Sequence, residues 1–267
     1  MRIINGNYIS KIICGKCEDV MEDMPENFVD LTVTSPPYDK LRNYKGYKFD
    51  FKGTAKELYR VTKIGGVVVW VVGDQTINGS ETGTSFKQAL YFKEIGFNLH
   101  DTMIYQKLSV GACGSNLSYW QVFEYMFVFS KGKPKTVNRI KDKINSSVGH
   151  KNKPNKKMDL LKTRTNRVGV VVGEIGYREN IWIYHTGMLT RDDRTIHPAP
   201  FPEKLAADHI ISWSNESDIV LDPMCGSGTT CKMAKRLNRR YIGIDTSEKY
   251  CQISRDRISN TEEPLFK

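Results

Sequence analysis

The chain lacks the features that would place it in a membrane or outside the cell. Its 267 residues contain no run of 18 apolar residues, which excludes a membrane-spanning helix. The stretch between Met1 and Cys17 has neither an apolar core nor a small-residue cleavage site, so we expect no secretion signal. We therefore expect a cytoplasmic protein with no membrane partner.

Cysteines are few, and their spacing is poor for a metal site. There are six, and without export their thiols are expected to stay reduced. Cys14 and Cys17 form a single C-x-x-C pair. A zinc site needs a second pair with matching spacing, and Cys225 and Cys231 are too far apart to supply it. The spacing therefore predicts no metal site.

One stretch of the chain lacks aromatic residues and almost lacks acidic ones. Between Lys131 and Arg167 there are 13 Lys/Arg, 2 Asp/Glu and no Phe, Trp or Tyr, whereas the rest of the chain has 27 basic and 28 acidic residues. Such a segment buries little apolar area, so we expect it to be mobile alone and ordered by a polyanion. It is either a solvated insertion or a nucleic-acid contact. Because the charge is of one sign and the rest of the chain is nearly neutral, the nucleic-acid contact is favoured. About six phosphate contacts would make log affinity fall with log salt concentration at a slope near −5.

Strand and helix patterns alternate along the chain, which predicts an α/β fold with a mostly parallel sheet covered on both faces. The predicted strands are residues 9–14, 29–34, 67–72, 103–106, 125–130, 219–221 and 241–244. The predicted helices are residues 18–24, 56–61, 86–95, 203–213 and 229–237, and residues 39–53 are expected to form a loop.

A glycine-rich turn lies between two predicted elements near the C-terminus, in IVLDPMCGSGTTCKMAKRLNRRYIGID. Gly226 and Gly228 let the backbone approach a ligand, and the following helix offers free N–H groups. Asp245 follows Gly226 by 19 residues, a spacing that suits an acid at ribose hydroxyls. The turn is no P-loop, and Cys231 replaces the third glycine of the dinucleotide fingerprint, which disfavours a nicotinamide oxidoreductase. A nucleoside-cofactor site is predicted; a plain strand-to-helix turn is the alternative.

A second turn, Ser35-Pro36-Pro37-Tyr38, closes a hydrophobic strand. The prolines fix the backbone and remove two donors, which leaves the Ser35 hydroxyl and the Pro36 carbonyl as acceptors. Two acceptors can hold the hydrogens of an exocyclic amino group and aim its lone pair at a methyl donor. The Tyr38 ring can stack on the base. A proline-rich surface turn is the alternative interpretation.

Six blocks of sequence together resemble the β class of S-adenosylmethionine-dependent DNA amino-methyltransferases, over nearly the whole chain. They are CGKCEDVMEDMPENFVDLTVTSPPY, RVTKIGGVVVWVVGD, WQVFEYMFVFSKGK, HPAPFPEKLAADHI, DPMCGSGTT and YIGIDTSEKY. The resemblance implies a Rossmann-like fold with a seven-stranded sheet in circularly permuted order, because the glycine turn follows the Ser-Pro-Pro-Tyr turn. We expect a catalytic half in residues 1–130, a basic DNA-recognition insertion in 131–175 and the cofactor-binding half of the same domain in 176–267.

The resemblance also implies roles for particular residues. Ser35, Pro36, Pro37 and Tyr38 would be catalytic. Those expected to bind S-adenosylmethionine are Cys17, Phe201, Asp222, Pro223, Cys225, Gly226, Gly228, Thr229, Thr230 and Asp245, with Asp245 at the ribose and Phe201 at the cofactor edge. The family usually has an acid after the glycine of its first block, whereas this chain has Lys16 after Gly15.

The expected reaction is methylation of a base flipped out of double-stranded DNA, by direct in-line transfer. Ser35 resembles cytosine-N4 members and adenine-N6 members more often carry Asp there, so N4 of cytosine is favoured and N6 of adenine is the alternative. An inactive DNA-binding module with the same fold is a further alternative. Methylation at cytosine C5 is excluded, since the chain has no Pro-Cys pair. The expected partners are double-stranded DNA, which the residues from Lys131 to Arg167 would bind, a restriction endonuclease and a second copy of the chain. The expected setting is prokaryotic or viral.

Overall fold

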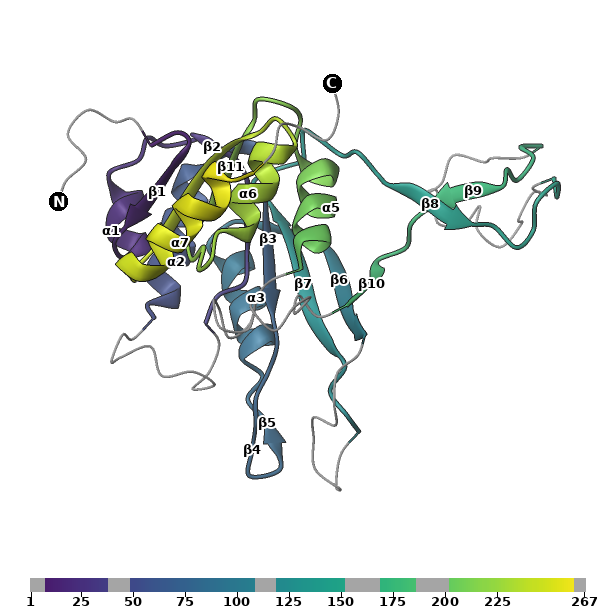
Figure 1. Cartoon of the computed structure of the whole chain (residues 1–267). Helices are drawn as coiled ribbons and strands as arrows, with labels where there is room; N and C mark the ends of the chain where they lie inside the picture. The colour runs from purple at the N-terminus through teal and green to yellow at the C-terminus, as the bar shows by residue number, and fades with distance from the viewer. Residues whose placement is uncertain (1–7, 38–48, 109–118, 152–168, 186–201, 262–267) are drawn as a thin grey trace. The chain divides into compact units, whose positions relative to one another are not determined.

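The computed structural model describes residues 8–37, 49–108, 119–151, 169–185 and 202–261. The chain forms two compact units (Figure 1). The main unit comprises Met1–Asn138 and Asn180–Lys267, and the small unit comprises Arg139–Glu179. No described helix is both long enough and apolar enough to cross a membrane.

The main unit is built on a sheet of eight strands in the order β1-β12-β11-β2-β3-β7-β6-β10. Strand β7 runs antiparallel to β3 and β6, and the other neighbours are parallel. The strands are β1 (Lys11–Cys14), β2 (Val29–Thr34), β3 (Thr62–Val72), β6 (Asn98–Leu108), β7 (Phe123–Ser130), β10 (Ile181–His185), β11 (Ile219–Asp222) and β12 (Arg240–Asp245). The mostly parallel α/β fold is confirmed.

Helices cover the sheet in two series, α1-α2-α3 and α5-α6-α7, whose members pack against their neighbours (Figure 1). They are α1 (Cys17–Glu22), α2 (Phe51–Val61), α3 (Thr84–Glu94), α5 (Glu203–Trp213), α6 (Thr229–Arg236) and α7 (Glu248–Ser259). The β2-α2-β3 and β11-α6-β12 crossovers step in opposite directions across the sheet. Because such crossovers are right-handed, α2 and α6 lie on opposite faces.

All of the predicted strands and helices are present, but three predictions need correction. The sheet has an eighth strand, β10, whose apolar alternation in IWIYH is typical of a half-buried edge strand. Helix α7 was not expected, because its sequence is mostly polar. The predicted loop at residues 39–53 is wrong at its end: α2 begins at Phe51, and the Asp50 carboxylate caps it by accepting from Gly53 N at 3.0 Å. Residues 39–48 lie outside the described residues.

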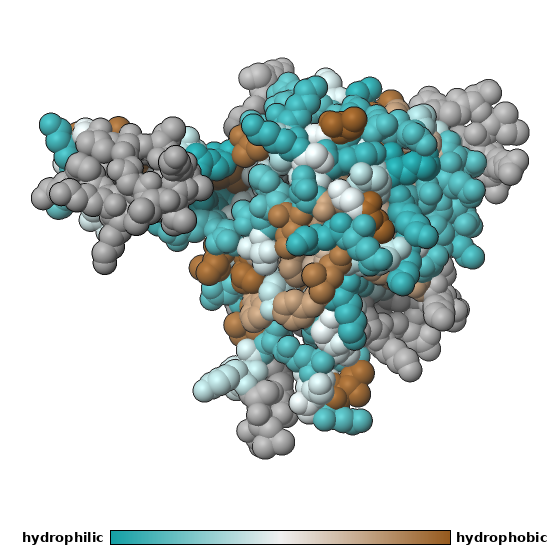
Figure 2. All heavy atoms as spheres, turned by 180° about the vertical axis from the view of Figure 1, so that it is seen from behind, coloured by the Kyte–Doolittle hydropathy of each residue, from teal (hydrophilic) through white to brown (hydrophobic). Residues whose placement is uncertain are grey.

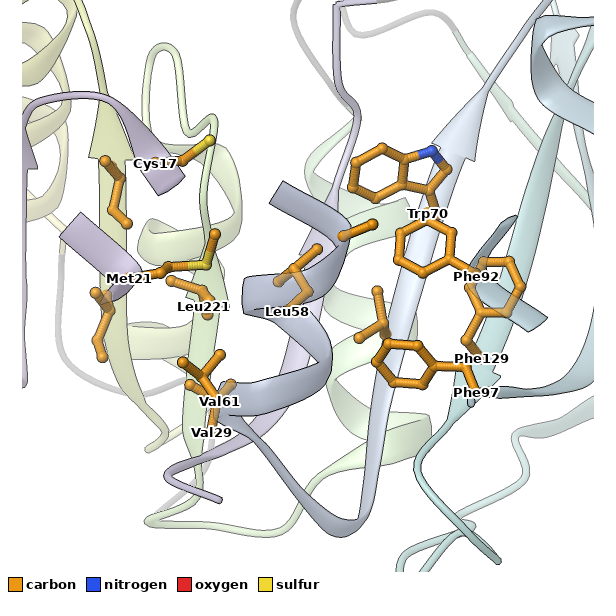
Figure 3. Close-up of a cluster of buried hydrophobic side chains, with 14 of the residues drawn as sticks. Cys17, Met21, Val29, Leu58, Val61, Trp70, Phe92, Phe97, Phe129 and Leu221 are labelled. Atoms are coloured by element: carbon orange, nitrogen blue, oxygen red, sulfur yellow. The ribbon is translucent and has the colours of Figure 1, made fainter. Parts of the chain in front are cut away.

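Large side chains from the helices and from the strands fill the core between the α1-α2-α3 series and the sheet (Figure 3). Trp70, Phe92 and Phe129 are fully buried, and the rings of Phe92 and Phe129 stack with centroids 4.6 Å apart. Trp70 Nε1 donates to Gln88 Oε1 at 2.8 Å, so the buried indole N–H is satisfied. Each large side chain removed from water here contributes about 1.5–3 kcal/mol.

The surface of the main unit is hydrophilic over most of the face in Figure 2, with apolar side chains in several small areas. Large apolar residues are exposed on α3 and on the edge strand β10, among them Phe86, Leu90, Ile181 and Ile183. A two-stranded hairpin of β4 (Thr76–Ile77) and β5 (Ser80–Glu81) precedes α3.

The small unit contains an antiparallel pair of strands, β8 (Lys141–Ile144) and β9 (Ile175–Tyr177). Part of the basic segment, expected to be mobile, is therefore a strand, because a partner from beyond the segment supplies its backbone hydrogen bonds. Every residue of β8 is exposed. The unit begins at Arg139 and ends at Glu179, whereas the expected insertion covered residues 131–175.

Candidate functional site

Three polar side chains meet where parallel strands end. Asp222 ends β11, Asp245 ends β12 and Thr34 ends β2, and these strands are neighbours in the order β12-β11-β2. In open α/β sheets, ligands bind outside the carboxyl ends of the strands. The crossovers change direction between the neighbouring strands β11 and β2, so this edge is the candidate site.

The glycine turn between β11 and α6 has a backbone that few other residues could adopt. Gly226 has φ 50° and Gly228 has φ 81°, in the left-handed region that favours glycine. A Cβ on Gly228 would lie 2.8 Å from Cβ of Ser254, so a side chain there would also clash with α7. Cys225 N donates to Ile244 O at 2.8 Å and fixes the turn beside β12. The turn is thus a compact backbone surface at the N-terminus of α6, as predicted.

Asp245 holds this turn from the neighbouring strand. Its Oδ2 accepts from Gly226 N at 3.0 Å, and its Oδ1 accepts from Ser247 N at 2.8 Å. Burial raises the pKa of the carboxyl, although both backbone N–H groups favour the charged form. A carboxylate offers about four acceptor positions, so two remain for ligand hydroxyls.

Asp222 joins the glycine turn to the strand that carries the second motif. Its Oδ1 accepts from Thr34 Oγ1 at 2.8 Å and from Met224 N at 3.2 Å. Burial raises the pKa of Asp222 to about 6, against the hydrogen bonds that lower it. A second link runs from α6, where Thr230 Oγ1 donates to Val33 O at 3.2 Å. These two bonds bring the motifs side by side, although they are 188 and 197 residues apart in sequence.

The Ser-Pro-Pro-Tyr turn continues directly from β2. Pro36 is buried, whereas Ser35 and Pro37 are partly exposed. Tyr38 lies outside the described residues, and so does Phe201. The structure therefore sets the start of this turn beside the glycine turn.

The remaining expected cofactor residues separate into two groups. Pro223, Cys225 and Thr229 belong to the glycine turn and the first turn of α6. Cys17 is buried on α1, where its Sγ lies 3.3 Å from Oγ1 of Thr54 on α2, and burial raises the pKa of its thiol to about 12. Its contacts are those of a side chain that packs between two helices.

Two residues of α7 that sequence reasoning missed hold the turn from outside. Ser254 Oγ donates to Gly226 O at 2.7 Å. Arg257 Nη1 donates to the carbonyl of Ser227 at 2.7 Å and to its Oγ at 2.8 Å. Arg257 Nη2 also lies 3.1 Å from Glu203 Oε1 on α5. The sequence holds little signal for them, because α7 follows the last strand, where no crossover is required, and its residues are mostly polar.

The basic segment divides between the two units. Lys131 belongs to the main unit, where its Nζ donates to Tyr59 O at 2.8 Å and to Asn27 Oδ1 at 3.0 Å. Burial lowers the pKa of Lys131. In the small unit, the Arg139 guanidinium stacks 3.8 Å from the Tyr177 ring centroid and Lys141 Nζ lies 5.1 Å from it.

Known proteins resemble the chain in sequence and in fold. Residues 29–256 match the N6/N4 methyltransferase family, described as DNA methylase. The orphan methyltransferase M.BamHII of Bacillus amyloliquefaciens is 57% identical over 245 residues, covering 90% of this chain and 92% of that protein. The type II methyltransferase M.BglII of Bacillus subtilis is 26% identical, covering 94% of this chain and 69% of its own length.

Two solved structures share the fold. The cytosine-N4-specific PvuII DNA methyltransferase aligns with a TM-score of 0.67 at 20% identity, covering 92% of this chain and 85% of its own. M1.HpyAVI in complex with S-adenosylmethionine aligns with a TM-score of 0.62 at 23% identity, covering 93% and 98%. The family match spans most of the chain and agrees with the geometry of the two turns, so the chain belongs to the N6/N4 family of DNA methylases.

Proposed function

We propose that the chain transfers a methyl group from S-adenosylmethionine to the exocyclic amino group of a base in double-stranded DNA, with N4 of cytosine favoured. The observation that carries the proposal is the pair of links, Asp222 to Thr34 and Thr230 to Val33, that sets the glycine turn against the Ser35 turn. A nucleoside-binding turn and an acceptor-rich turn at one sheet edge suit group transfer between a bound cofactor and a bound base.

The described residues fit S-adenosylmethionine. Gly226 and Gly228 have positive φ values that form a tight turn at the N-terminus of α6, and Asp245 has acceptor positions left for ribose hydroxyls. Asp222 supplies a buried carboxyl beside the turn. When bound, the cofactor supplies a methyl group activated by a sulfonium.

The chain's own residues would position the amino group. The Ser35 hydroxyl and the Pro36 carbonyl accept its two hydrogens and direct the nitrogen lone pair toward the cofactor. Buried Pro36 fixes the direction of that carbonyl, since proline restricts the backbone. Tyr38, outside the described residues, is expected to stack on the flipped base. No covalent bond between enzyme and base is needed.

Cytosine is the preferred base on two grounds. Ser35 resembles the cytosine-N4 members, and the PvuII methyltransferase that shares this fold is cytosine-N4-specific. Adenine N6 is the second candidate, since Ser also occurs at this position in adenine-N6 members. The relatives named above come from bacteria, so we assign the reaction to DNA in the cytoplasm.

DNA contact is assigned to the basic segment between Lys131 and Arg167, most of which belongs to the small unit. Arg139 and Lys141 are held on one aromatic ring, which orients two cations together. A two-stranded ribbon such as β8-β9 has the width of the DNA major groove. A restriction endonuclease and a second copy of the chain remain expected partners. The relative M.BamHII is named an orphan, which weighs against a dedicated endonuclease.

The proposal is tested by mass spectrometry of nucleosides in DNA from a methylation-free host that expresses the chain. N4-methylcytosine is the expected product, absent when the host expresses Ser35→Ala. N6-methyladenine would keep the enzyme class and correct the base. If neither mark appears while the folded protein binds the cofactor, the chain is the inactive DNA-binding alternative and the proposal is wrong.

A further inference from the structure

Two thiols and a carboxylate meet on the main unit, outside the glycine turn. Cys14 ends β1, and Glu248 and Cys251 lie three residues apart on α7, hence on one face of the helix. One ligand atom from each residue lies within 4.8 Å of the others. The three are 237 residues apart at the widest, so the C-x-x-C spacing of Cys14 with Cys17 gave no hint of this cluster.

The thiols sit against backbone that joins two elements. Cys14 Sγ lies 3.8 Å from Thr246 O, and Cys251 Sγ lies 3.5 Å from Asp245 O and 3.7 Å from Ile13 O. Cys14 and Glu248 are exposed, whereas Cys251 is fully buried. The cluster is thus accessible to an ion from solvent through Cys14 and Glu248, and the sulfur of Cys251 offers a buried ligand next to them.

We propose that Cys14, Cys251 and Glu248 bind a thiophilic divalent cation such as Zn²⁺, with water in a fourth position. Two sulfurs and one carboxylate oxygen match the ligands that Zn²⁺ takes in proteins. A tetrahedral site with Zn–S of about 2.3 Å separates its ligands by about 3.8 Å. Side-chain rotations that move the ligand atoms by about 1 Å would therefore bring them from within 4.8 Å of one another to this separation.

Binding exchanges existing contacts for metal bonds. Each thiol releases its proton to water when its sulfur becomes a ligand. Arg255 Nη1 lies 2.6 Å from Glu248 Oε1 and competes for that carboxylate, which leaves the two sulfurs as the dominant ligands. The site joins the end of β1 to the first turns of α7, so occupancy stabilises the folded main unit. This inference does not depend on the methyl transfer proposed above.

The test is titration of the reduced full chain with Co²⁺, which reports tetrahedral thiolate ligation by its visible bands and a sulfur-to-metal band in the ultraviolet. We expect one Co²⁺ per chain at this site, displaced by Zn²⁺. Cys14→Ser and Cys251→Ser should each reduce the intensity of the sulfur-to-metal band. Each should also weaken Co²⁺ affinity by more than about 100-fold, because loss of a group that only supports a metal ligand already costs up to that much. Glu248→Gln should weaken it less.

Cys17→Ser is the matched control, because Cys17 is a described cysteine that is not part of the cluster and whose Sγ lies against Oγ1 of Thr54; it should keep the spectrum. Zn²⁺ should raise the Tm of the wild type and leave that of Cys14→Ser unchanged. Exposed Cys14 can be replaced without opening the core, so this variant should fold. Absence of a sulfur-to-metal band, or wild-type affinity in Cys14→Ser, would overturn the proposal and leave the thiols as packing groups.

Discussion

The main unit and the small unit are stabilised in different ways. In the main unit, β3 is buried along VVVWVV and large rings stack beneath the helices. In the small unit, the cross-strand neighbours Ile144 and Ile175 are 85% and 60% exposed, and the close contacts are ion pairs such as Arg178 with Asp142 and Lys143 with Glu179. Burial fixes the unit that carries the two turns, whereas charge and exposed side chains dominate the unit assigned to DNA.

Replacing one apolar side chain in each unit gives the largest expected contrast. Phe92→Ala should lower the free energy of unfolding by about 3–5 kcal/mol, because it leaves a cavity among packed rings. Ile175→Ala should change it by less than about 0.5 kcal/mol, as for an exposed site. Urea unfolding of both variants measures the difference. Equal losses would show that the small unit is stabilised by a core of its own.

Within the main unit, Ser35→Ala separates chemistry from binding. We expect kcat to fall by about 100- to 1000-fold, the loss typical of removing one polar group that stabilises a transition state. The Kd for DNA should barely change, and Tyr38→Ala should behave in the same direction. Ser80→Ala, on the exposed β4-β5 hairpin, is the control and should keep full turnover. A parallel loss of DNA affinity in Ser35→Ala would show that Ser35 holds the DNA rather than the amino hydrogens.

The buried Asp222 should make the stability of the main unit depend on pH. Its folded pKa of about 6 lies above the value of about 3.9 for an unfolded Asp. Between these two pKa values the folded state keeps a proton that the unfolded state has lost, so the free energy of unfolding falls as the pH rises. The loss amounts to up to about 3 kcal/mol and is complete once the pH has risen through about 6.

Asp222→Asn tests this dependence by chemical unfolding at several pH values. The stability of the variant relative to the wild type should rise between about pH 4 and about pH 6 and stay level above that. Exposed Asp19→Asn, the control, should show a constant difference. If Asp222→Asn also gives a constant difference, the carboxyl of Asp222 is ionised throughout.

The parts of the site that sequence could predict are those set by local geometry. Gly226, Gly228 and Asp245 follow from the spacing of one strand, turn and helix, and the structure places them together. The links from Asp222 to Thr34 and from Thr230 to Val33 depend on which strands become neighbours, and periodicity cannot determine that. The supports from α7 were missed because its buried positions are short or polar side chains such as Cys251 and Ser254, which give a weak apolar pattern.

The smallest effect is expected from charge in the small unit, and it shows in salt dependence rather than in folding. Arg139→Ala combined with Lys141→Ala removes two cations that share the Tyr177 ring. Each phosphate contact contributes about 0.9 to the slope of log affinity against log salt, so the slope should flatten by nearly 2 while thermal stability stays constant. Lys56→Ala combined with Lys93→Ala, on exposed positions of α2 and α3, should leave the slope unchanged. An unchanged slope in the first pair would mean that this ribbon does not face the phosphates, and the DNA contact would then fall to basic residues elsewhere in the segment.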